Sequence, residues 1–404
     1  MNLVRVRPGG SRGLPPLGRA PLDRGLVGRP ERDGALWRVD WVIAGCALVL
    51  SLLGSLLVWS ATRPRLIEAG GDPDAYLKRH LLNLAIGLVL GVLFAVVDYR
   101  ALRAYAPLVY LASCAGLVAV LLVGQTINGA HSWIVLGGGF QVQPSEFAKV
   151  ALVVGMAVLL AERHTQERTS RGSDVPLVLA LAAVPLGLVM LQPDLGTAMV
   201  FVFTVLGVLA LAGAPARWLL GLILLGVAVV VGAVRFGVLE DYQLERFRAF
   251  TTQDVDTLGA AYNITQARIA IGNGGLTGTG LFYGTQTTGK FVPEQQTDFI
   301  FTVAGEELGL LGAGGIVLLF GLLLWRTLRL AGRSPDLFGR LVAGGVACWL
   351  AFQVFVNIGM TLGIMPITGL PLPFVSYGGS SMFANWMAVG LLLNVHARVR
   401  EDDY

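Results

Sequence analysis

Long apolar segments are the feature of this sequence that most restricts its fold. A stretch of about 18 to 20 apolar residues is long enough to cross the hydrocarbon core of a bilayer as a helix. Such stretches recur along the chain, and 54% of its 404 residues are hydrophobic while only 14% are charged. This composition excludes a soluble globular protein and predicts a polytopic membrane protein.

The apolar stretches predict an all-α bundle of ten transmembrane helices. These helices are expected near residues 41–60, 81–98, 105–124, 146–162, 175–191, 197–213, 217–236, 300–325, 341–364 and 380–397. A long loop, about 237–299, separates the seventh helix from the eighth. The chain therefore divides into a transmembrane domain, 41–404, and a preceding tail, 1–40, whose Pro, Gly and Arg content predicts disorder.

The distribution of basic residues predicts how the helices are oriented. The tail carries eight arginines, from Arg5 to Arg38, with no apolar segment ahead of them. The connections without any Lys or Arg are 125–144, 192–196 and 365–379. Because basic connections stay in the cytoplasm, both termini are predicted to be cytoplasmic and the 237–299 loop to lie outside the plasma membrane. The basic segment 61–80 is the exception to this pattern.

Charge and cysteine usage exclude other classes of function. The formal net charge of +4 comes largely from arginines on the predicted cytoplasmic side, which favours contact with anionic membrane lipid and does not indicate nucleic acid. Cys46, Cys114 and Cys348 fall inside predicted helices without metal-ligand spacing. We interpret them as small apolar side chains.

Polar residues gather at the predicted outer ends of the helices. Glu146 and Lys149 share one helix face, where they form either a simple ion pair or part of an electropositive pocket open to the outside. Asp194 precedes the sixth helix, so capping of that helix explains it as well as ligand binding does. An outward-facing polar site is therefore expected.

The segment PITGLPLPFVSYGGSS, before the last helix, has too many prolines and glycines for a regular helix. Irregular backbone at membrane depth persists only where it is buried in protein or faces water. We therefore expect this segment to line a cavity. Ser376, Tyr377 and Ser380 are its candidate hydrogen-bond donors.

The loop stretch YNITQARIAIGNGGLTGTGLFYGTQ begins with the pattern of a short amphipathic helix on the membrane surface. Its glycines lack the GK[ST] sequence and the preceding strand of a phosphate-binding loop, which excludes a nucleotide site. They form either flexible turns or a set of N–H groups that face an anionic ligand.

The stretch PEQQTDFIF places Asp298 at the start of the eighth predicted helix. Asp298 either caps that helix, alone or together with Thr297, or acts as a general base at its outer mouth. Glu306 and Glu307 lie about two turns deeper, at 1.5 Å per residue. Since an unpaired charge there costs several kcal/mol, both need partners on neighbouring helices.

Five segments together resemble a known family. They are NGAHSWIVLGGGFQVQPSEFAK, LQPDLGTA, NITQARIAIGNGGLTGTGLFYGTQ, FVPEQQTDFIFTVAGEELG and NIGMTLGIMPITGLPLPFVSYGGSS. The chain resembles the SEDS proteins of bacteria, the group of RodA and FtsW, and PITGLPLPFVSYGG is more similar to the elongation-type RodA. The resemblance implies a peptidoglycan glycosyltransferase that polymerises lipid II outside the plasma membrane, with a class B penicillin-binding protein as its transpeptidase partner.

The resemblance also implies functional residues. The essential carboxylate of the family's TDF motif falls on Asp298, the expected general base for the attacking sugar hydroxyl. The other important polar positions fall on Arg100, Glu146, Lys149, Asp194 and Gln266. Lys149, oriented by Glu146, is expected to stabilise the leaving pyrophosphate, with or without a divalent cation such as Mg²⁺ or Mn²⁺.

Two positions depart from the family pattern. Gln296 stands where the family usually has His, and Ser132 stands where it commonly has Arg. If that arginine binds pyrophosphate, the charge has to come from Lys149, Lys290, His131 or a divalent cation.

Two other functions fit a ten-helix bundle with broken segments. A flippase for lipid-linked precursors is favoured by Glu306 and Glu307 inside the membrane segment. A membrane scaffold for the transpeptidase needs no polar cavity. The gathering of polar residues at one face, away from the midplane, favours the polymerase.

Overall fold

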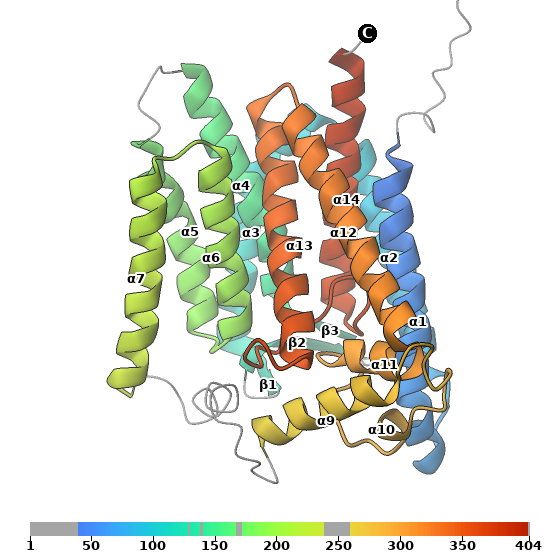
Figure 1. Ribbon diagram of the computed structural model, residues 1–404. Coiled ribbons are helices and arrows are strands. Elements are labelled where there is room, and N and C mark those ends of the chain that lie inside the picture. Colours follow the sequence, from blue (N-terminus) through green and yellow to red (C-terminus); the bar gives the residue numbers. More distant parts are fainter. Residues whose placement is uncertain (1–38, 128–129, 138–139, 167–171, 238–258, 403–404) are drawn as a thin grey trace, which may run out of the picture. The chain divides into compact units, whose positions relative to one another are not determined.

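The computed structural model describes residues 39–127, 130–137, 140–166, 172–237 and 259–402. The predicted tail, 1–40, lies outside this part of the chain apart from residues 39 and 40. Figure 1 shows long helices that run side by side and short elements at one of their ends.

The long helices are α1 (Trp41–Glu68), α2 (Ala75–Val96), α3 (Tyr99–Val123), α4 (Pro144–Gln166), α5 (Asp174–Met190), α6 (Leu195–Leu211), α7 (Ala216–Arg235), α12 (Gly309–Arg333), α13 (Leu337–Thr361) and α14 (Gly379–Asp402). The short helices are α9 (Ala260–Asn273), α10 (Thr285–Thr288) and α11 (Ile300–Glu307).

Seven of the described helices are long and apolar enough to cross a membrane. They are α1, α2, α3, α4, α7, α12 and α13. Helices α5 and α6 are apolar but have 17 residues each. A polytopic, largely α-helical membrane protein is thereby confirmed, whereas the count of ten spans and the side on which each loop lies stay predictions.

Three short strands form a small sheet that the sequence patterns did not predict. The strands β1 (Gln125–Ile127), β2 (Ala130–Gly137) and β3 (Phe140–Val142) pair antiparallel in the order β1-β2-β3. They connect α3 to α4 and lie at the same end of the bundle as α9, α10 and α11 (Figure 1). We call this end the strand end. The opposite end, where α14 finishes, is the C-terminal end.

The predicted eighth helix, 300–325, is broken in the structure. α11 stops at Glu307 and α12 starts at Gly309, whose φ of +63° favours glycine. The loop before α10 fills the break: the Leu310 and Leu311 N–H groups donate to carbonyl oxygens of residues 275 and 276, at 2.9 and 3.1 Å. Backbone groups that the break exposes are thus satisfied by another part of the chain.

Ion pairs connect helix ends at the C-terminal end of the bundle. Arg326 on α12 lies 2.7 Å from the buried carboxylate of Asp40, which caps α1, and His396 on α14 lies 3.8 Å from the same oxygen. Arg398 also lies 3.8 Å from Asp98, the N-cap of α3. These contacts fix the starts of α1 and α3 against α12 and α14.

Candidate active site

Asp298 lies in a turn whose backbone is held by three hydrogen bonds from distant parts of the chain. The Gln296 carbonyl oxygen accepts from the Tyr377 N–H at 2.8 Å. The carbonyl oxygen of residue 297 accepts from the Ser376 hydroxyl. The carbonyl oxygen of Asp298 accepts from Nδ2 of Asn357 on α13, at 2.8 Å. We call this arrangement the carbonyl clamp. It holds the backbone that carries Asp298, and such support from neighbouring residues preorganises a functional side chain.

Asp298 lies one residue before the N-cap position of α11. The N-cap position of α11 is occupied by Phe299, and the helix begins at Ile300. The hydroxyl of Thr297 is directed to Glu294, whose carbonyl and carboxylate oxygens both lie 3.2 Å away. The side chain of Asp298 is half-buried at the strand end.

The irregular segment before α14 is held by its own side chains. The buried Ser376 hydroxyl accepts from the Leu372 N–H at 2.8 Å in addition to its bond in the carbonyl clamp. The buried Ser380 hydroxyl accepts from the Gln143 N–H at 2.9 Å, in the connection between β3 and α4. Both serines therefore position backbone, whereas the sequence had suggested that they donate to a ligand. Tyr377 is half-buried.

Glu146 and Lys149 form a fully buried ion pair. Lys149 Nζ lies 2.7 Å from Glu146 Oε1, and the two side chains are 1% and 2% exposed. Lys149 also donates to Gln353 at 3.1 Å and lies 4.9 Å from the centre of the Trp349 ring. Of the two interpretations, the structure matches the ion pair, because the ammonium group is enclosed and does not face an open pocket.

Asp194 is the N-cap of α6. Its carboxylate accepts from the Thr197 N–H at 2.9 Å and from the Thr197 hydroxyl at 2.8 Å. Nε2 of Gln143 donates to the same carboxylate at 3.0 Å. The capping interpretation is confirmed, and the carboxylate also joins α6 to the connection that leads into α4.

The remaining predicted binding residues lie in different places. Gln266 is half-buried on α9, near the strand end. Lys290 pairs with Glu68 at the last residue of α1. Arg100 is exposed at the start of α3, which is at the C-terminal end of the bundle. Arg100 is therefore not part of the site that contains Asp298.

Glu306 holds the outer loop against α11. Its Oε1 accepts from the Gln286 N–H at 2.7 Å, and its Oε2 accepts from the N–H and the hydroxyl of Thr287 at 2.8 and 2.7 Å. These donors belong to α10, a short helix of the loop, so the partners of Glu306 lie on a neighbouring helix, as predicted, but not on one of the ten predicted spans. The buried carboxylate is satisfied by backbone and hydroxyl donors of the loop.

Glu307 has a partner on a neighbouring helix, as predicted. Its Oε1 accepts from the Ser60 hydroxyl on α1 at 2.6 Å and from the Phe282 N–H at 3.3 Å. Phe282 has a φ of +70°, a backbone conformation uncommon for a residue with a side chain. The two adjacent carboxylates thus hold the loop to α1 and α11.

Replacing Glu306 with glutamine is expected to accelerate amide exchange at Gln286 and Thr287 at least about tenfold. A hydrogen bond to a charged group contributes about 1.5 to 3 kcal/mol, and about 1.4 kcal/mol corresponds to tenfold in an opening equilibrium. Hydrogen exchange read by mass spectrometry measures the effect. Glu162→Gln, at an exposed position on α4, is the control, and unchanged exchange in Glu306→Gln contradicts the prediction.

The two departures from the family pattern have different surroundings. Ser132, on β2, is 1% exposed, so this position faces the protein interior. Gln296 is half-buried, and its side chain donates to Glu294 at 3.3 Å while its carbonyl takes part in the carbonyl clamp. His131 lies 3.0 Å from the Thr126 hydroxyl within the sheet.

A resident metal ion has no evident ligand set in the described part of the chain. No group of three or more His, Cys, Asp or Glu side chains lies together there. Near Asp298, the carbonyl oxygens of residues 296–298 are engaged in the carbonyl clamp, and Glu294 is the one other carboxylate of the turn. We therefore derive no step through a metal ion.

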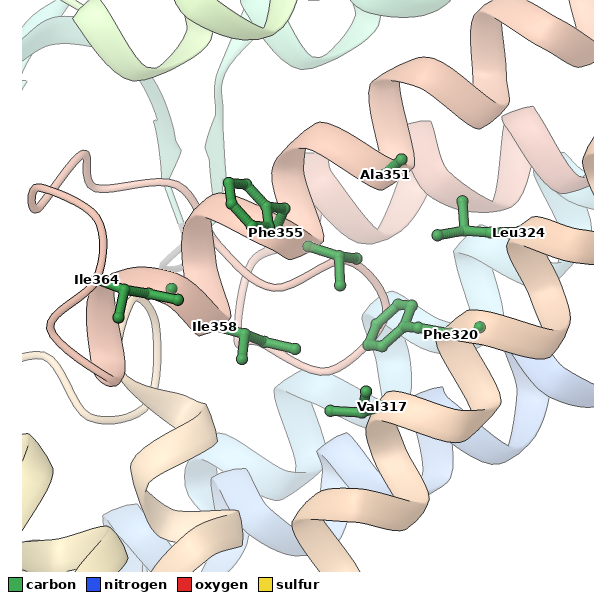
Figure 2. Close-up of a pocket in the computed structure, with 10 residues that line it drawn as sticks. Val317, Phe320, Leu324, Ala351, Phe355, Ile358 and Ile364 are labelled. Atoms are coloured by element: carbon green, nitrogen blue, oxygen red, sulfur yellow. The ribbon is translucent and has the colours of Figure 1, made fainter.

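An apolar cavity of about 300 Å³ lies between α12 and α13 (Figure 2). Phe320 and Leu324 line it from α12, and Phe355 and Ile358 line it from α13. All of its lining residues are apolar, so an occupant has to be apolar as well. None of the polar site residues contributes to it.

Sequence comparison shows relatives over almost the whole chain. Residues 40–401 match the family described as "Cell cycle protein", which comprises FtsW, RodA and SpoVE. Stage V sporulation protein E of Bacillus subtilis is 39% identical over 88% of this chain and 96% of its own length. Peptidoglycan glycosyltransferase MrdB of Escherichia coli is 38% identical, over 86% and 91%. The probable peptidoglycan glycosyltransferase FtsW of Aeromonas salmonicida is 37% identical, over 94% and 95%.

Structural comparison agrees with this relationship. A chain from a peptidoglycan synthase complex, described as coordinating polymerization and crosslinking, has a TM-score of 0.75, is 36% identical and covers 90% of this chain and 99% of its own. The rod shape determining protein RodA of Thermus thermophilus has a TM-score of 0.65 and is 35% identical, over 89% and 96%. The identities to the SpoVE, MrdB and FtsW relatives are similar and do not separate the subtypes of the family. This chain belongs to the SEDS family of FtsW, RodA and SpoVE.

Proposed function

We propose that this protein is a peptidoglycan glycosyltransferase that polymerises lipid II into glycan strands. The observation that carries the proposal is the carbonyl clamp, which holds the backbone of Asp298 in place at the strand end. The strand end faces the outside of the plasma membrane and both termini are cytoplasmic, in agreement with the arginine distribution. The names of two relatives, glycosyltransferases for peptidoglycan, support the same reaction.

The reaction joins two lipid-linked disaccharides. The 4-hydroxyl oxygen of one sugar forms a bond to the anomeric carbon of the other, and the bond from that carbon to the lipid pyrophosphate breaks with its electron pair on the phosphate oxygen. Asp298 takes the hydroxyl proton, because a free hydroxyl is a poor nucleophile. Direct displacement inverts the configuration at the anomeric carbon.

The proposed partner is a class B penicillin-binding protein that crosslinks the new strands. The support is the likeness to a chain of a complex that couples polymerization with crosslinking. The similarity of PITGLPLPFVSYGG to RodA favours a role in cell elongation.

The sequence feature that had favoured transport has another explanation in the structure. Glu306 and Glu307 hold the loop through hydrogen bonds, so neither carboxylate is required as a relay for cargo. The polar residues of the strand end therefore favour polymerisation over transport as the function.

The test is glycan-strand formation from purified lipid II by the protein and its transpeptidase partner in detergent, with and without a chelator. Polymer is expected, and its loss on chelation indicates a required metal ion. The matched assay follows fluorescent lipid II between the leaflets of vesicles. If a folded complex exchanges lipid II between leaflets but forms no polymer, the protein is a transporter and not a polymerase. If the folded complex shows neither polymer nor leaflet exchange, the scaffold function is the one that remains.

A further inference from the structure

Three polar side chains lie at four-residue intervals on α13. Trp349, Gln353 and Asn357 are each fully buried. Residues four apart share one face of a helix, one turn above another. Lys149 contacts the first two of these side chains, and the turn that carries Asp298 contacts the third. The row therefore connects the buried ion pair of α4 to the candidate active site.

Gln353 is hydrogen-bonded at both atoms of its amide group. Its Oε1 accepts from Lys149 Nζ at 3.1 Å and from Trp349 Nε1 at 2.8 Å. Its Nε2 donates to the Pro371 carbonyl oxygen at 2.8 Å. The two donors fix which way the amide points, because an NH₂ group turned toward them would find no acceptor there. The side chain thus joins Lys149 to the irregular segment before α14.

Asn357 joins the same segment to the turn that carries Asp298. Its Nδ2 donates to the Leu370 carbonyl oxygen at 2.7 Å and to the Asp298 carbonyl oxygen at 2.8 Å. Leu370 directly precedes Pro371, the residue that Gln353 holds. A shift of the segment at Pro371 therefore changes the position of a carbonyl that shares one amide group with Asp298.

The segment 370–376 has a backbone that needs support from its neighbours. Phe374 has a φ of +65°, which is uncommon for a bulky side chain. Backbone of this kind persists where the surrounding structure holds it. The segment packs closely on α1, since a side-chain carbon at Gly54 would lie 2.4 Å from the Val375 carbonyl oxygen. α13 adds hydrogen bonds to this packing, among them the one from Gln353.

We propose that Gln353 is a positioning residue for the polymerisation reaction. It holds the 370–376 segment, and the Ser376 hydroxyl of that segment in turn holds the turn that carries Asp298. The inference rests on the proposed function, since it concerns the geometry of the same site. The buried ion pair of α4 contributes by fixing the amide of Gln353. Neither Gln353 nor the pair touches the sugars or transfers a proton.

The experiment measures hydrogen exchange and glycan formation in the complex of the protein with its transpeptidase partner. Gln353→Glu keeps an oxygen that accepts from Lys149 and Trp349 but turns another oxygen toward the Pro371 carbonyl. It is expected to accelerate exchange of the Tyr377 amide, a donor of the carbonyl clamp, about tenfold. It is expected to lower kcat about 10- to 100-fold, the effect of a small misplacement of a catalytic group, and to change KM by less than about twofold.

Asn394→Asp is the matched control. Asn394, on α14, is buried, and its Nδ2 donates to three backbone carbonyl oxygens within residues 94–97 at the C-terminal end of the bundle. The same change from amide to carboxylate thus removes donors to backbone carbonyls far from the carbonyl clamp. It is expected to lower the unfolding temperature and to leave Tyr377 exchange and kcat within about twofold of the parent values.

A second variant guards against misfolding caused by an added charge. Gln353→Met has a similar volume and no charge, and it also lacks the donor to Pro371. It is expected to accelerate Tyr377 exchange about threefold to tenfold.

Three outcomes would overturn the proposal. They are parent-like Tyr377 exchange in both Gln353 variants, parent-like kcat in both whether or not the unfolding temperature falls, and an equal acceleration of exchange in Asn394→Asp. Exchange is measured without turnover, so it reports on the positioning by Gln353 even in a parent complex that forms no polymer. A failure of this inference is therefore distinct from a failure of the proposed function.

Discussion

Asp298→Asn is expected to polymerise lipid II about 10² to 10⁴ times more slowly than the parent protein, the usual contribution of a positioned general base. Asparagine has nearly the same shape as aspartate but cannot take up the hydroxyl proton. The carbonyl clamp binds backbone oxygens of residues 296–298, so the turn is expected to keep its conformation. The loss is therefore expected in kcat, with little change in thermal stability.

The measurement is the initial rate of glycan formation by the complex with its partner. Glu294→Gln is the matched control, because Glu294 is an exposed carboxylate in the same turn and glutamine keeps an oxygen that accepts from Thr297. It is expected to retain the parent rate within about twofold. An Asp298→Asn protein that is folded, binds its partner and polymerises at the parent rate removes Asp298 from the chemistry.

Lys149→Met is expected to destabilise the protein by about 3 to 5 kcal/mol, the cost of leaving one partner of a buried ion pair uncompensated. Glu146 is 2% exposed, and within the described residues its Oε2 has no hydrogen-bond partner. Removal of Lys149 would leave its carboxylate with no cation in contact. Methionine fills a similar volume, so the loss of charge dominates over the loss of packing.

Thermal unfolding in detergent measures the effect, and a double variant provides the control. Glu146→Gln combined with Lys149→Met removes both charges and is expected to recover most of the lost stability, because the two residues are in direct contact. Equal stability of Lys149→Met and the parent contradicts the prediction. Parent-rate polymerisation by the double variant limits the role of this pair to folding.

The sequence patterns predicted those features that depend on neighbours along the chain. Apolar length predicted the seven described helices that are long enough to cross a membrane. The i,i+3 spacing predicted the pair of Glu146 and Lys149, and the position of Asp194 before an apolar run predicted a cap. Each of these interactions is contained within a few residues. Helical periodicity and capping rules apply directly at that range.

The features that were missed depend on contacts between distant segments. The break before Gly309 requires loop carbonyls from residues 275 and 276. The donors to Glu306 lie about twenty residues earlier in the chain, and Ser376 lies 79 residues after the carbonyl that it binds. No local pattern encodes such a partner, because it is selected by how the helices pack. For the same reason the sequence assigned Ser376 to a ligand.

The carbonyl clamp also bears on how this turn tolerates sequence change. Its donors recognise backbone oxygens, which every amino acid possesses, so the identity of the side chain at position 296 does not enter the three hydrogen bonds. Replacement of Gln296 by histidine is therefore expected to leave the three hydrogen bonds of the carbonyl clamp in place. Proline is excluded at 297 and 298, where both N–H groups donate to the Glu294 carbonyl at 3.2 Å. A different side chain at position 296 therefore changes the chemical surroundings of Asp298, whereas the backbone geometry of the turn stays the same.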